Sequence, residues 1–236
     1  MKQTFEMSAD GAWELVGGLS KPSKMPCHGY SIPAKRCKVG SKLREVAGSI
    51  CSKCYAMKGR YTFANVANAL ERRFASLEDP AWIDAMVVLI SKHCAKSGHF
   101  RWHDAGDVQS VQHLSRIMEV CRRTPDIRHW LPTREYQAVR EWKAANGEFP
   151  ENLCVRASLF MLNQAFNRAL TQGLGCPSSG ASQRQTRPSL ANVRTVAERS
   201  IDAVTTYCPA PQQGGKCGDC RNCWNRDVTH VGYKVH

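Results

Sequence analysis

The sequence predicts an α/β protein whose parallel sheet forms a partial (β/α) barrel of the TIM type. Short apolar segments that follow a strand pattern alternate with longer segments of helical periodicity. Charged and polar motifs come directly after several of the predicted strands, where the ligand sites of such folds lie. A complete eight-fold barrel averages about 250 residues. A chain of 236 residues with two cysteine-rich segments therefore has room for about five or six βα units.

The chain is expected to form a single domain, 1–236, because 236 residues are enough for one sizeable core. Residues 1–60 form a cysteine-rich entry loop in this prediction, 61–207 the βα array and 208–236 a cysteine-rich knuckle. Gly17 to Gly48 is rich in Gly, Pro, Lys and Ser and lacks periodicity, so it is predicted to be irregular.

The elements follow from periodicity and from helix-start and turn residues. Apolar residues at helical spacing from Phe63 to Phe74 predict a helix at 62–77, and Asp79-Pro80 starts the next one. Alternating residues predict a strand that ends at His103, before Asp104-Ala105-Gly106-Asp107. In chain order, the predicted elements are helix 62–77, helix 80–94, strand 99–103, helix 111–121, strand 127–131, helix 135–145, strand 152–159, helix 162–170, loop 173–188, helix 190–199 and strand 202–207.

The net charge and hydropathy of the chain limit the classes of binding partner to be expected. The formal net charge is +13 and the isoelectric point about 9.4, which favours nucleic acid, DNA or RNA, as partner. A basic surface that only aids solubility is the alternative. No apolar run approaches the roughly 18 residues of a membrane span, and the N-terminus lacks a secretory signal pattern, so a cytoplasmic protein is expected.

The first cysteine group consists of Cys27, Cys37, Cys51 and Cys54. Thiols in a reducing compartment are more often metal ligands, catalytic groups or core residues than disulfides. Two thiolates separated by two residues bind one metal ion or cluster from a single turn, and distant cysteines complete the set. A redox pair of Cys51 and Cys54 is the alternative, but it leaves the other two cysteines without a role.

The second group lies near the C-terminus: Cys208, Cys217, Cys220 and Cys223, with His230 shortly after. Cysteines at successive three-residue steps with Gly, Asp and Asn between them predict a metal-binding knuckle. Four thiolates suit an iron–sulfur cluster or zinc, whereas three thiolates with His230 suit zinc better.

Polar residues at predicted strand ends are the candidate catalytic and binding groups. Asp104 and Asp107 follow one strand, and Gly106 between them allows close backbone approach. Capping of the next helix is the alternative role of Asp107. Arg134 and Arg156 are expected to bind anionic groups, since an arginine forms paired hydrogen bonds with carboxylates and phosphates.

Cys51-Ser52-Lys53-Cys54-Tyr55-Ala56, the strand into His103–Asp107, Pro132-Thr133-Arg134 and the tail cysteines together resemble the phage gene-product-88 family. The order of motifs also resembles the radical S-adenosylmethionine enzymes, which are partial barrels. That resemblance implies a 4Fe-4S cluster on Cys37, Cys51 and Cys54, with S-adenosylmethionine contacted by Tyr55, Gly106 and Asp107. It also implies a second cluster on the tail cysteines. The resemblance to phage proteins implies that this protein is located in the cytoplasm of an infected bacterium.

Three alternatives stay open. Thirteen residues separate Cys37 from Cys51, a wide spacing similar to that of 7-carboxy-7-deazaguanine synthase; if Cys27 is a fourth ligand, the front centre is structural. The chain is also similar to the guanine transglycosylases, which combine a βα barrel, a zinc knuckle and two aspartates at strand ends. That resemblance implies that Asp104 and Asp107 catalyse the exchange of a nucleic-acid base. The third alternative is a non-enzymatic nucleic-acid-binding protein with two structural metal sites.

Overall fold

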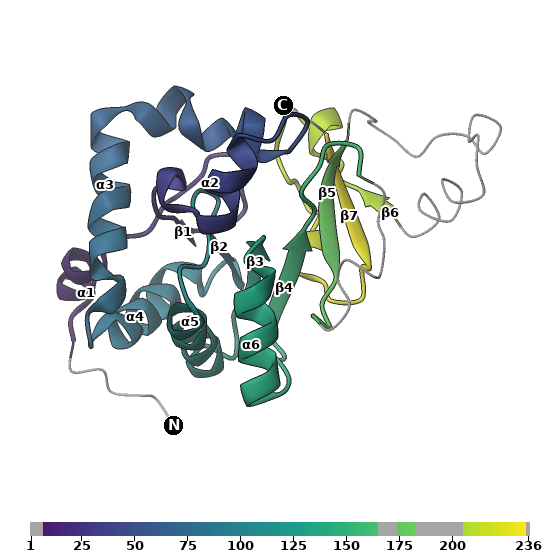
Figure 1. Ribbon diagram of the computed structural model, residues 1–236. Helices are drawn as coiled ribbons and strands as arrows, with labels where there is room; N and C mark the ends of the chain where they lie inside the picture. Colours follow the sequence, from purple (N-terminus) through teal and green to yellow (C-terminus); the bar gives the residue numbers. More distant parts are fainter. Residues whose placement is uncertain (1–6, 165–173, 183–204, 235–236) are drawn as a thin grey trace.

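A parallel seven-stranded sheet runs through the computed structural model, which describes residues 7–164, 174–182 and 205–234 (Figure 1). The strand order is β1-β2-β3-β4-β5-β7-β6, so β1 and β6 are the edges and the sheet is open. The prediction of an α/β fold with a parallel sheet is confirmed. The strands are β1 Gly29–Tyr30, β2 His99–Trp102, β3 Arg128–Thr133, β4 Leu153–Ser158, β5 Ser178–Ser182, β6 Thr205–Tyr207 and β7 His230–Lys234.

The described α-helices all precede β5 in the chain. They are α1 Ala9–Val16, α2 Lys38–Arg44, α3 Ala64–Ala75, α4 Trp82–Cys94, α5 Val111–Arg123 and α6 Tyr136–Asn146. Short 3₁₀ turns are η1 Ala34–Arg36, η2 Cys51–Lys53, η3 Tyr55–Met57, η4 Gly59–Thr62, η5 Ser76–Glu78, η8 Ala210–Gln212 and η9 Asn222–Trp224. Among the described helices, none has the length and apolar character that a bilayer crossing needs.

Elements with clear periodicity agree with the prediction to within about two residues at each end: α3, α4, α5, α6, β2 and β4. β3 begins one residue later and ends two residues later than predicted. The predicted strand at 202–207 appears as β6 from Thr205. Its first residues, the predicted helix 190–199 and positions 165–170 of the predicted helix 162–170 lie outside the described residues.

Five elements contradict the prediction or were missed, and the first of them is α1, which lies within the predicted entry loop at 1–60. The segment expected to be irregular contains β1 and α2, and the loop expected at 173–188 contains β5. β7 has no counterpart in the prediction, and residues 162–164 are not helical. β1 is only two residues long and β5 consists of Ser, Gly and Ala, so neither carries the alternating apolar pattern of a strand. Their backbone pairing with neighbouring strands makes them part of the sheet.

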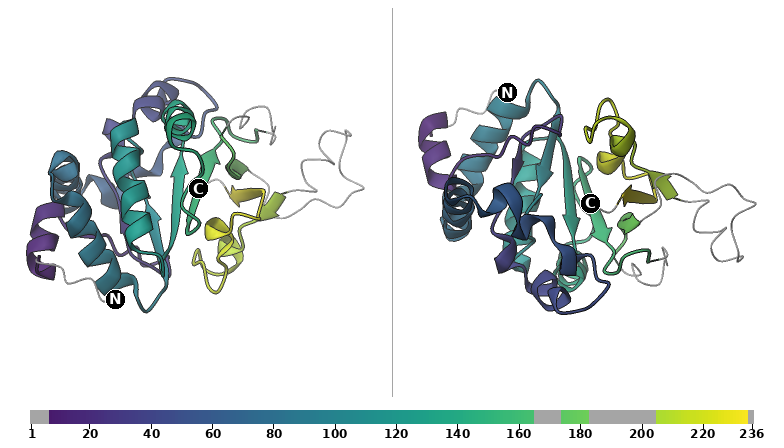
Figure 2. Two further views of the ribbon diagram at one scale, coloured as in Figure 1. Left: turned by 90° about the horizontal axis from the view of Figure 1, so that it is seen from below. Right: turned by 90° about the horizontal axis from the view of Figure 1, so that it is seen from above.

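The two faces of the sheet are covered by different parts of the chain (Figure 2). Along β2, Phe100 and Trp102 belong to the main core with α4, α5 and α6, whereas Arg101 between them packs against Trp130. Trp130 in turn forms a second core with Trp224 and Val231. Because successive strand residues point to opposite faces, the helices cover one face and the C-terminal segment covers the other.

Two buried histidines of the main core are held neutral. Thr124 Oγ1 donates to Val120 O, so it accepts a hydrogen bond from His129 Nε2 at 2.8 Å. Burial lowers the pKa of His129 to about 3, and burial together with Arg116 lowers the pKa of His113 to about 3. The folded chain therefore resists protonation of both rings.

We expect the free energy of unfolding to fall as the pH is lowered from 7 to 5. The unfolded chain protonates His113 and His129 near pH 6.5, whereas the folded chain does not. The loss is about 2 kcal/mol for each of the two histidines at pH 5. Urea denaturation at both pH values measures it, and His129→Leu is expected to show a smaller pH difference than the wild-type chain. An equal difference in both proteins would contradict this account.

Candidate functional site

The carboxyl ends of β1 to β4 lie side by side along one end of the sheet. This end is the carboxyl edge, as distinct from the edge strands β1 and β6, and the first cysteine segment lies over it. Ile32 N, just after β1, donates to Ala105 O, just after β2, at 3.1 Å. Val39 N at the start of α2 donates to Glu135 Oε1 after β3 at 2.9 Å. Ile50 N donates to Phe160 O after β4 at 2.8 Å. These bonds join residues 32–50 to the loops after three neighbouring strands.

Two tyrosines attach the rest of the segment to the loop after β2. Tyr55 Oη donates to the carbonyl of Asp104, and Tyr61 Oη donates to Asp104 Oδ2 at 2.7 Å. The two rings lie 5.8 Å apart, centroid to centroid. Tyr55, which the sequence predicts to contact a cofactor, therefore lies at the site, but its hydroxyl is already hydrogen-bonded to the backbone of Asp104.

Cys37, Cys51 and Cys54 come together at this edge. An added Cβ atom at Gly40 in α2 would lie 3.6 Å from the sulfur of Cys37 and 3.6 Å from that of Cys51. Cys54 packs beside Ala34, Ala56 and Ala105. Glycine at position 40 thus leaves space next to two thiols, and an added Cβ would be in ordinary contact with the sulfurs but tight against Cys37 Cβ, 3.0 Å away.

Burial dominates the electrostatics of these thiols. It raises the pKa of Cys37 to about 12, and the charges of Asp107, Cys54 and Cys51 act in the same direction. The pKa of Cys51 is also raised by burial, with Arg134 opposing the shift. Three thiols and two carboxyl groups thus share a buried region whose opposing positive charges include Arg134 and Arg44. A bound cation would stabilise the thiolate forms here.

Asp107 joins the ends of β2 and β3. Its Oδ1 accepts hydrogen bonds from Thr133 Oγ1 at 2.6 Å and from Val108 N at 2.8 Å, and its Oδ2 accepts one from Arg134 N at 2.9 Å. Burial raises its pKa to about 6 despite these bonds. The carboxylate therefore has most of its acceptor capacity engaged within the protein.

Asp104 has an unused acceptor. Its Oδ2 receives the hydroxyl of Tyr61, whereas its buried Oδ1 has no hydrogen-bond partner among the described residues. A buried oxygen without a partner costs free energy and is typical of a site that receives a ligand or a water. Of the two predicted aspartates, Asp104 is the one with an oxygen free to bind.

Gly106 and Arg134 complete the edge. Gly106 has a φ of +81°, and an added Cβ there would lie 2.3 Å from the side chain of Ile32 and 2.7 Å from its carbonyl oxygen. Glycine is therefore required for packing against the end of β1. Arg134 Nε donates to Leu159 O at 3.1 Å, and its terminal guanidinium nitrogens have no hydrogen bond to the described residues. This arginine retains donors for an anionic group.

Cys27 does not join the first cysteine group. It packs with Cys223 and Trp224 on the opposite face of the sheet, and its nearest thiol charges come from Cys94 and Cys217. Burial raises its pKa to about 12. The grouping of Cys27 with Cys37, Cys51 and Cys54 followed chain proximity, and the structure separates them because Cys27 precedes β1, whereas the other three cysteines follow it and lie beyond its carboxyl end.

The tail cysteines gather around residues 24–27. Cys217 N donates to Lys24 O at 3.1 Å, and Cys217 Sγ lies 3.9 Å from Met25 Sδ. Cys208 and Cys220 lie within electrostatic reach of Cys217, and Cys208 within reach of Cys223. Cys223 is also bonded to Tyr233 Oη at 3.1 Å. The knuckle of the prediction thus includes Cys27 as a neighbour.

No three His, Cys, Asp or Glu side chains within residues 7–164, 174–182 and 205–234 lie close enough to share one metal ion. His230, the predicted alternative ligand, lies in β7 with Nδ1 2.7 Å from Ser178 Oγ of β5. Its ring contributes to the joint between these two strands.

Arg156 has a different role from the predicted binding of an anion. It is fully buried in β4, and its five N–H groups point at backbone carbonyls. Nη1 donates to Ser178 and Val228 at 2.9 and 3.0 Å, Nη2 to Asn222 and Asn225 at 3.0 and 2.9 Å, and Nε to Cys223 at 3.5 Å. No donor is left for an anion, so Arg156 instead anchors the tail segment on the sheet.

Sequence reasoning missed Arg101, Tyr61, Glu135 and Gly40. Arg101 lies between the two cysteine groups: its charge acts on Tyr55 and Asp104 on one side and on Cys223 on the other. Its Nε is buried without a hydrogen-bond partner among the described residues. A charged residue at the centre of the predicted strand 99–103 was the available signal, as it was for Arg156.

Arg156→Lys and Arg156→Met are both expected to lower the free energy of unfolding by about 3 kcal/mol or more, because buried carbonyls lose their donors. Urea denaturation measures the loss. Arg226→Lys, an exposed change in the same segment, serves as control and should stay within about 0.5 kcal/mol of the wild-type chain. An Arg156→Lys variant as stable as this control would remove the anchoring role.

A family model described as Gene product 88 matches residues 4–226. Searches of curated proteins and of solved structures returned no match. The family expected from the cysteine and strand-end motifs is confirmed. Since the match spans nearly the whole sequence, this chain belongs to the Gene product 88 family.

Proposed function

We propose that this protein is an iron–sulfur enzyme of the radical S-adenosylmethionine type that acts on nucleic acid or on a nucleotide-derived substrate. The observation that carries the proposal is the meeting of Cys37, Cys51 and Cys54 at the carboxyl edge of the sheet, beside the loop that holds Asp104 and Asp107. Ligand sites of parallel α/β folds lie at this edge.

The donor set fits a 4Fe-4S cluster. Three thiols come from one segment, Gly40 leaves space beside two of them, and Arg134 and Arg44 oppose the added negative charge. In a cluster each cysteine thiolate binds a different iron atom. The cysteine sulfurs therefore lie farther apart than in a zinc site, where tetrahedral zinc–sulfur bonds set a separation of roughly 3.8 Å. When bound, such a cluster supplies the electron for reductive cleavage of S-adenosylmethionine.

The residues around the thiols suit an amino-acid group. Asp104 Oδ1 is the free acceptor for an ammonium group, and the terminal nitrogens of Arg134 are donors for a carboxylate. Asp107 acts as a positioning residue that holds the 104–107 loop and the backbone of Arg134 in place. This assignment shifts the direct contact expected at Asp107 to Asp104.

The sheet supports the same proposal. Strands β1 to β5 lie side by side in chain order and are all parallel, which is the arrangement of consecutive strands in a (β/α) barrel. We take the open sheet as part of such a barrel, with the tail segment covering its inner face. Cys27, Cys208, Cys217, Cys220 and Cys223 are the candidate ligands of a second iron–sulfur centre there; zinc, the other type expected, fits less well because no three of these described cysteines lie close enough to share one ion.

Base exchange by a guanine transglycosylase-like mechanism has weaker support. That mechanism needs two carboxylates with free oxygens. Asp107 has both of its oxygens engaged, and Asp104 alone of the pair retains a free one. The non-enzymatic alternative has no use for a free buried carboxylate oxygen beside three thiols.

Protein purified without oxygen is expected to contain iron and acid-labile sulfide. Cys51→Ser should lower the iron content by about four atoms per chain, since the front cluster loses a ligand. Cys121→Ala, a change at a buried cysteine of α5, serves as control and should keep the wild-type iron content. Zinc in place of iron, or iron that is unchanged in Cys51→Ser, would contradict the front cluster.

Asp104→Asn is expected to weaken S-adenosylmethionine binding by about tenfold or more, because the amide no longer carries the charge that attracts an ammonium group. Equilibrium dialysis with labelled cofactor measures this. Tyr61→Phe removes the bond to the other oxygen of Asp104 and should have the smaller effect. Equal affinity in Asp104→Asn and the wild-type chain would remove Asp104 from the cofactor site.

A further inference from the structure

The segment 35–63, which carries the front cysteines, has an unusual charge. Its first 26 residues, 35–60, contain eight Lys or Arg and one acidic residue, Glu45, and so hold more than half of the formal net charge of +13. Seven of these eight basic side chains are exposed: Lys35, Arg36, Lys38, Lys42, Lys53, Lys58 and Arg60. The basic character of the chain is therefore concentrated at one edge of the sheet.

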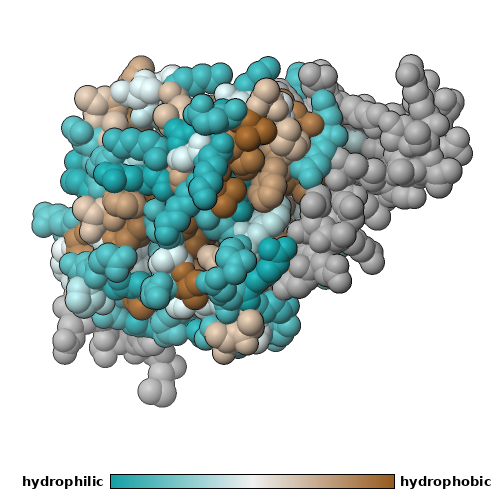
Figure 3. Space-filling view, viewed as in Figure 1, coloured by the Kyte–Doolittle hydropathy of each residue, from teal (hydrophilic) through white to brown (hydrophobic). Residues whose placement is uncertain are grey.

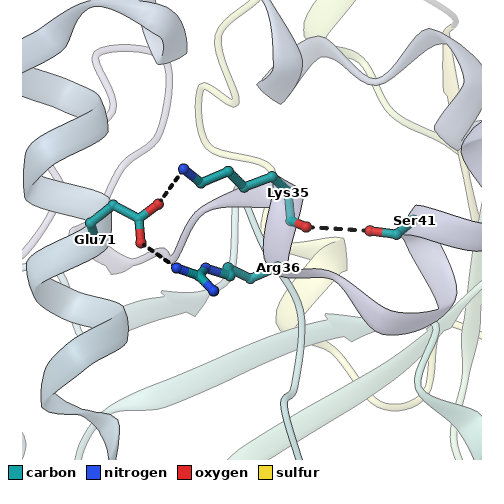
Figure 4. Close-up of polar contacts among 4 residues, drawn as sticks. All are labelled: Lys35, Arg36, Ser41 and Glu71. Carbon is teal, nitrogen blue, oxygen red and sulfur yellow. Dashed lines mark hydrogen bonds and ion pairs between the residues drawn. The ribbon is translucent and has the colours of Figure 1, made fainter.

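Two of these basic residues form ion pairs that fix the segment to α3. Lys35 Nζ lies 2.7 Å from Glu71 Oε1, and Arg36 Nη2 lies 3.4 Å from Glu71 Oε2, so both point at α3 (Figure 4). Lys53, Lys58 and Arg60 form no ion pair with any described residue. Their charges are free for an external polyanion.

Exposed apolar and aromatic side chains lie among the charges. The most exposed large hydrophobic residue of the described chain is Phe63, at 58% of its surface, and Tyr55 and Met57 are exposed by 45% and 42%. Figure 3 shows a mostly hydrophilic face on which hydrophobic residues gather in a patch beside α2. Aromatic faces next to lysine and arginine are the composition of surfaces on which nucleic-acid bases stack.

The surface adjoins the proposed site. The hydroxyls of Tyr55 and Tyr61 donate hydrogen bonds to Asp104, and Lys53, Lys58 and Arg60 lie within two residues of these tyrosines or between them. A nucleic-acid strand bound along these charges would therefore pass over the carboxyl edge, where the three thiols and Asp104 lie.

We infer that residues 35–63 bind single-stranded nucleic acid and present one of its nucleotides to the site at the sheet edge. The surface consists of short turns with exposed rings and the seven-residue helix α2, and the described part of it offers no long helix or β-ribbon to enter a duplex groove. Unpaired bases have free faces for stacking, whereas paired bases do not. As an assignment of the substrate, the inference rests on the proposed function.

The test is fluorescence anisotropy with labelled single-stranded DNA and RNA of about 15 nucleotides and with duplex DNA. The triple variant Lys53→Gln, Lys58→Gln, Arg60→Gln is expected to lose about tenfold in affinity for single strands, and its salt slope should fall by about 2. Lys92→Gln, Lys96→Gln, Arg128→Gln removes the same charge from exposed residues at the opposite edge of the sheet and should bind within about twofold of the wild-type chain.

Phe63→Ala is expected to weaken binding by about tenfold with an unchanged salt slope, because it removes a stacking ring and no charge. Phe63→Tyr should restore affinity. Equal losses in the two triple variants, tighter binding of duplex than of single strands, or no binding at low salt would each overturn the inference.

These measurements need no iron or cofactor, so the two proposals can fail separately. If the protein contains no iron but binds single strands through residues 35–63, the nucleic-acid surface is supported and the proposed radical enzyme is contradicted. Iron and cofactor binding without affinity for single strands would do the reverse.

Discussion

The buried carboxylate of Asp107 holds the functional edge of this protein together. Parallel strands bring their carboxyl ends to the same edge, but the loops that follow them need a common attachment. Asp107 supplies it by accepting bonds from Thr133 and from the backbone of Arg134, so the ends of β2 and β3 keep one relative position. Glu135, the next residue, then receives α2 through Val39 and places Cys37 over the same edge.

A second buried charge organises the opposite face. The guanidinium of Arg156 is surrounded by carbonyls of Ser178, Val228 and the turn at 222–225, with no carboxylate in its hydrogen-bond set. Carbonyl oxygens satisfy a planar five-donor cation without adding charge, which is why an arginine is tolerated inside a strand here. The tail cysteines are thereby held against Cys27 on the face that Arg101 and Trp130 line.

Much of the helical layer and the central strands was predictable, because α4, α5, β2 and β4 bury apolar residues at regular spacing. The three front cysteines were predictable as candidates from their spacing, and Asp104, Asp107 and Arg134 from their positions at the ends of predicted strands. The roles of Arg156, Asp107 and Cys27 were not predictable, because each depends on residues far away in the chain. Arg156 contacts the chain about 70 positions later, and Cys27 shares a buried cluster with Cys223.

The sequence by itself determined the alternation of strands and helices, the family, the basic charge and the set of chemically capable residues, because composition and local periodicity are properties of neighbouring residues. Only the tertiary structure decided which cysteines lie together, which of two aspartates keeps a free oxygen and where in the fold the basic segment 35–60 lies. These features depend on sheet order and on hydrogen bonds between distant segments. A one-residue shift in the pairing of β2 or β4 would turn Arg101 or Arg156 to the other face of the sheet with the sequence unchanged.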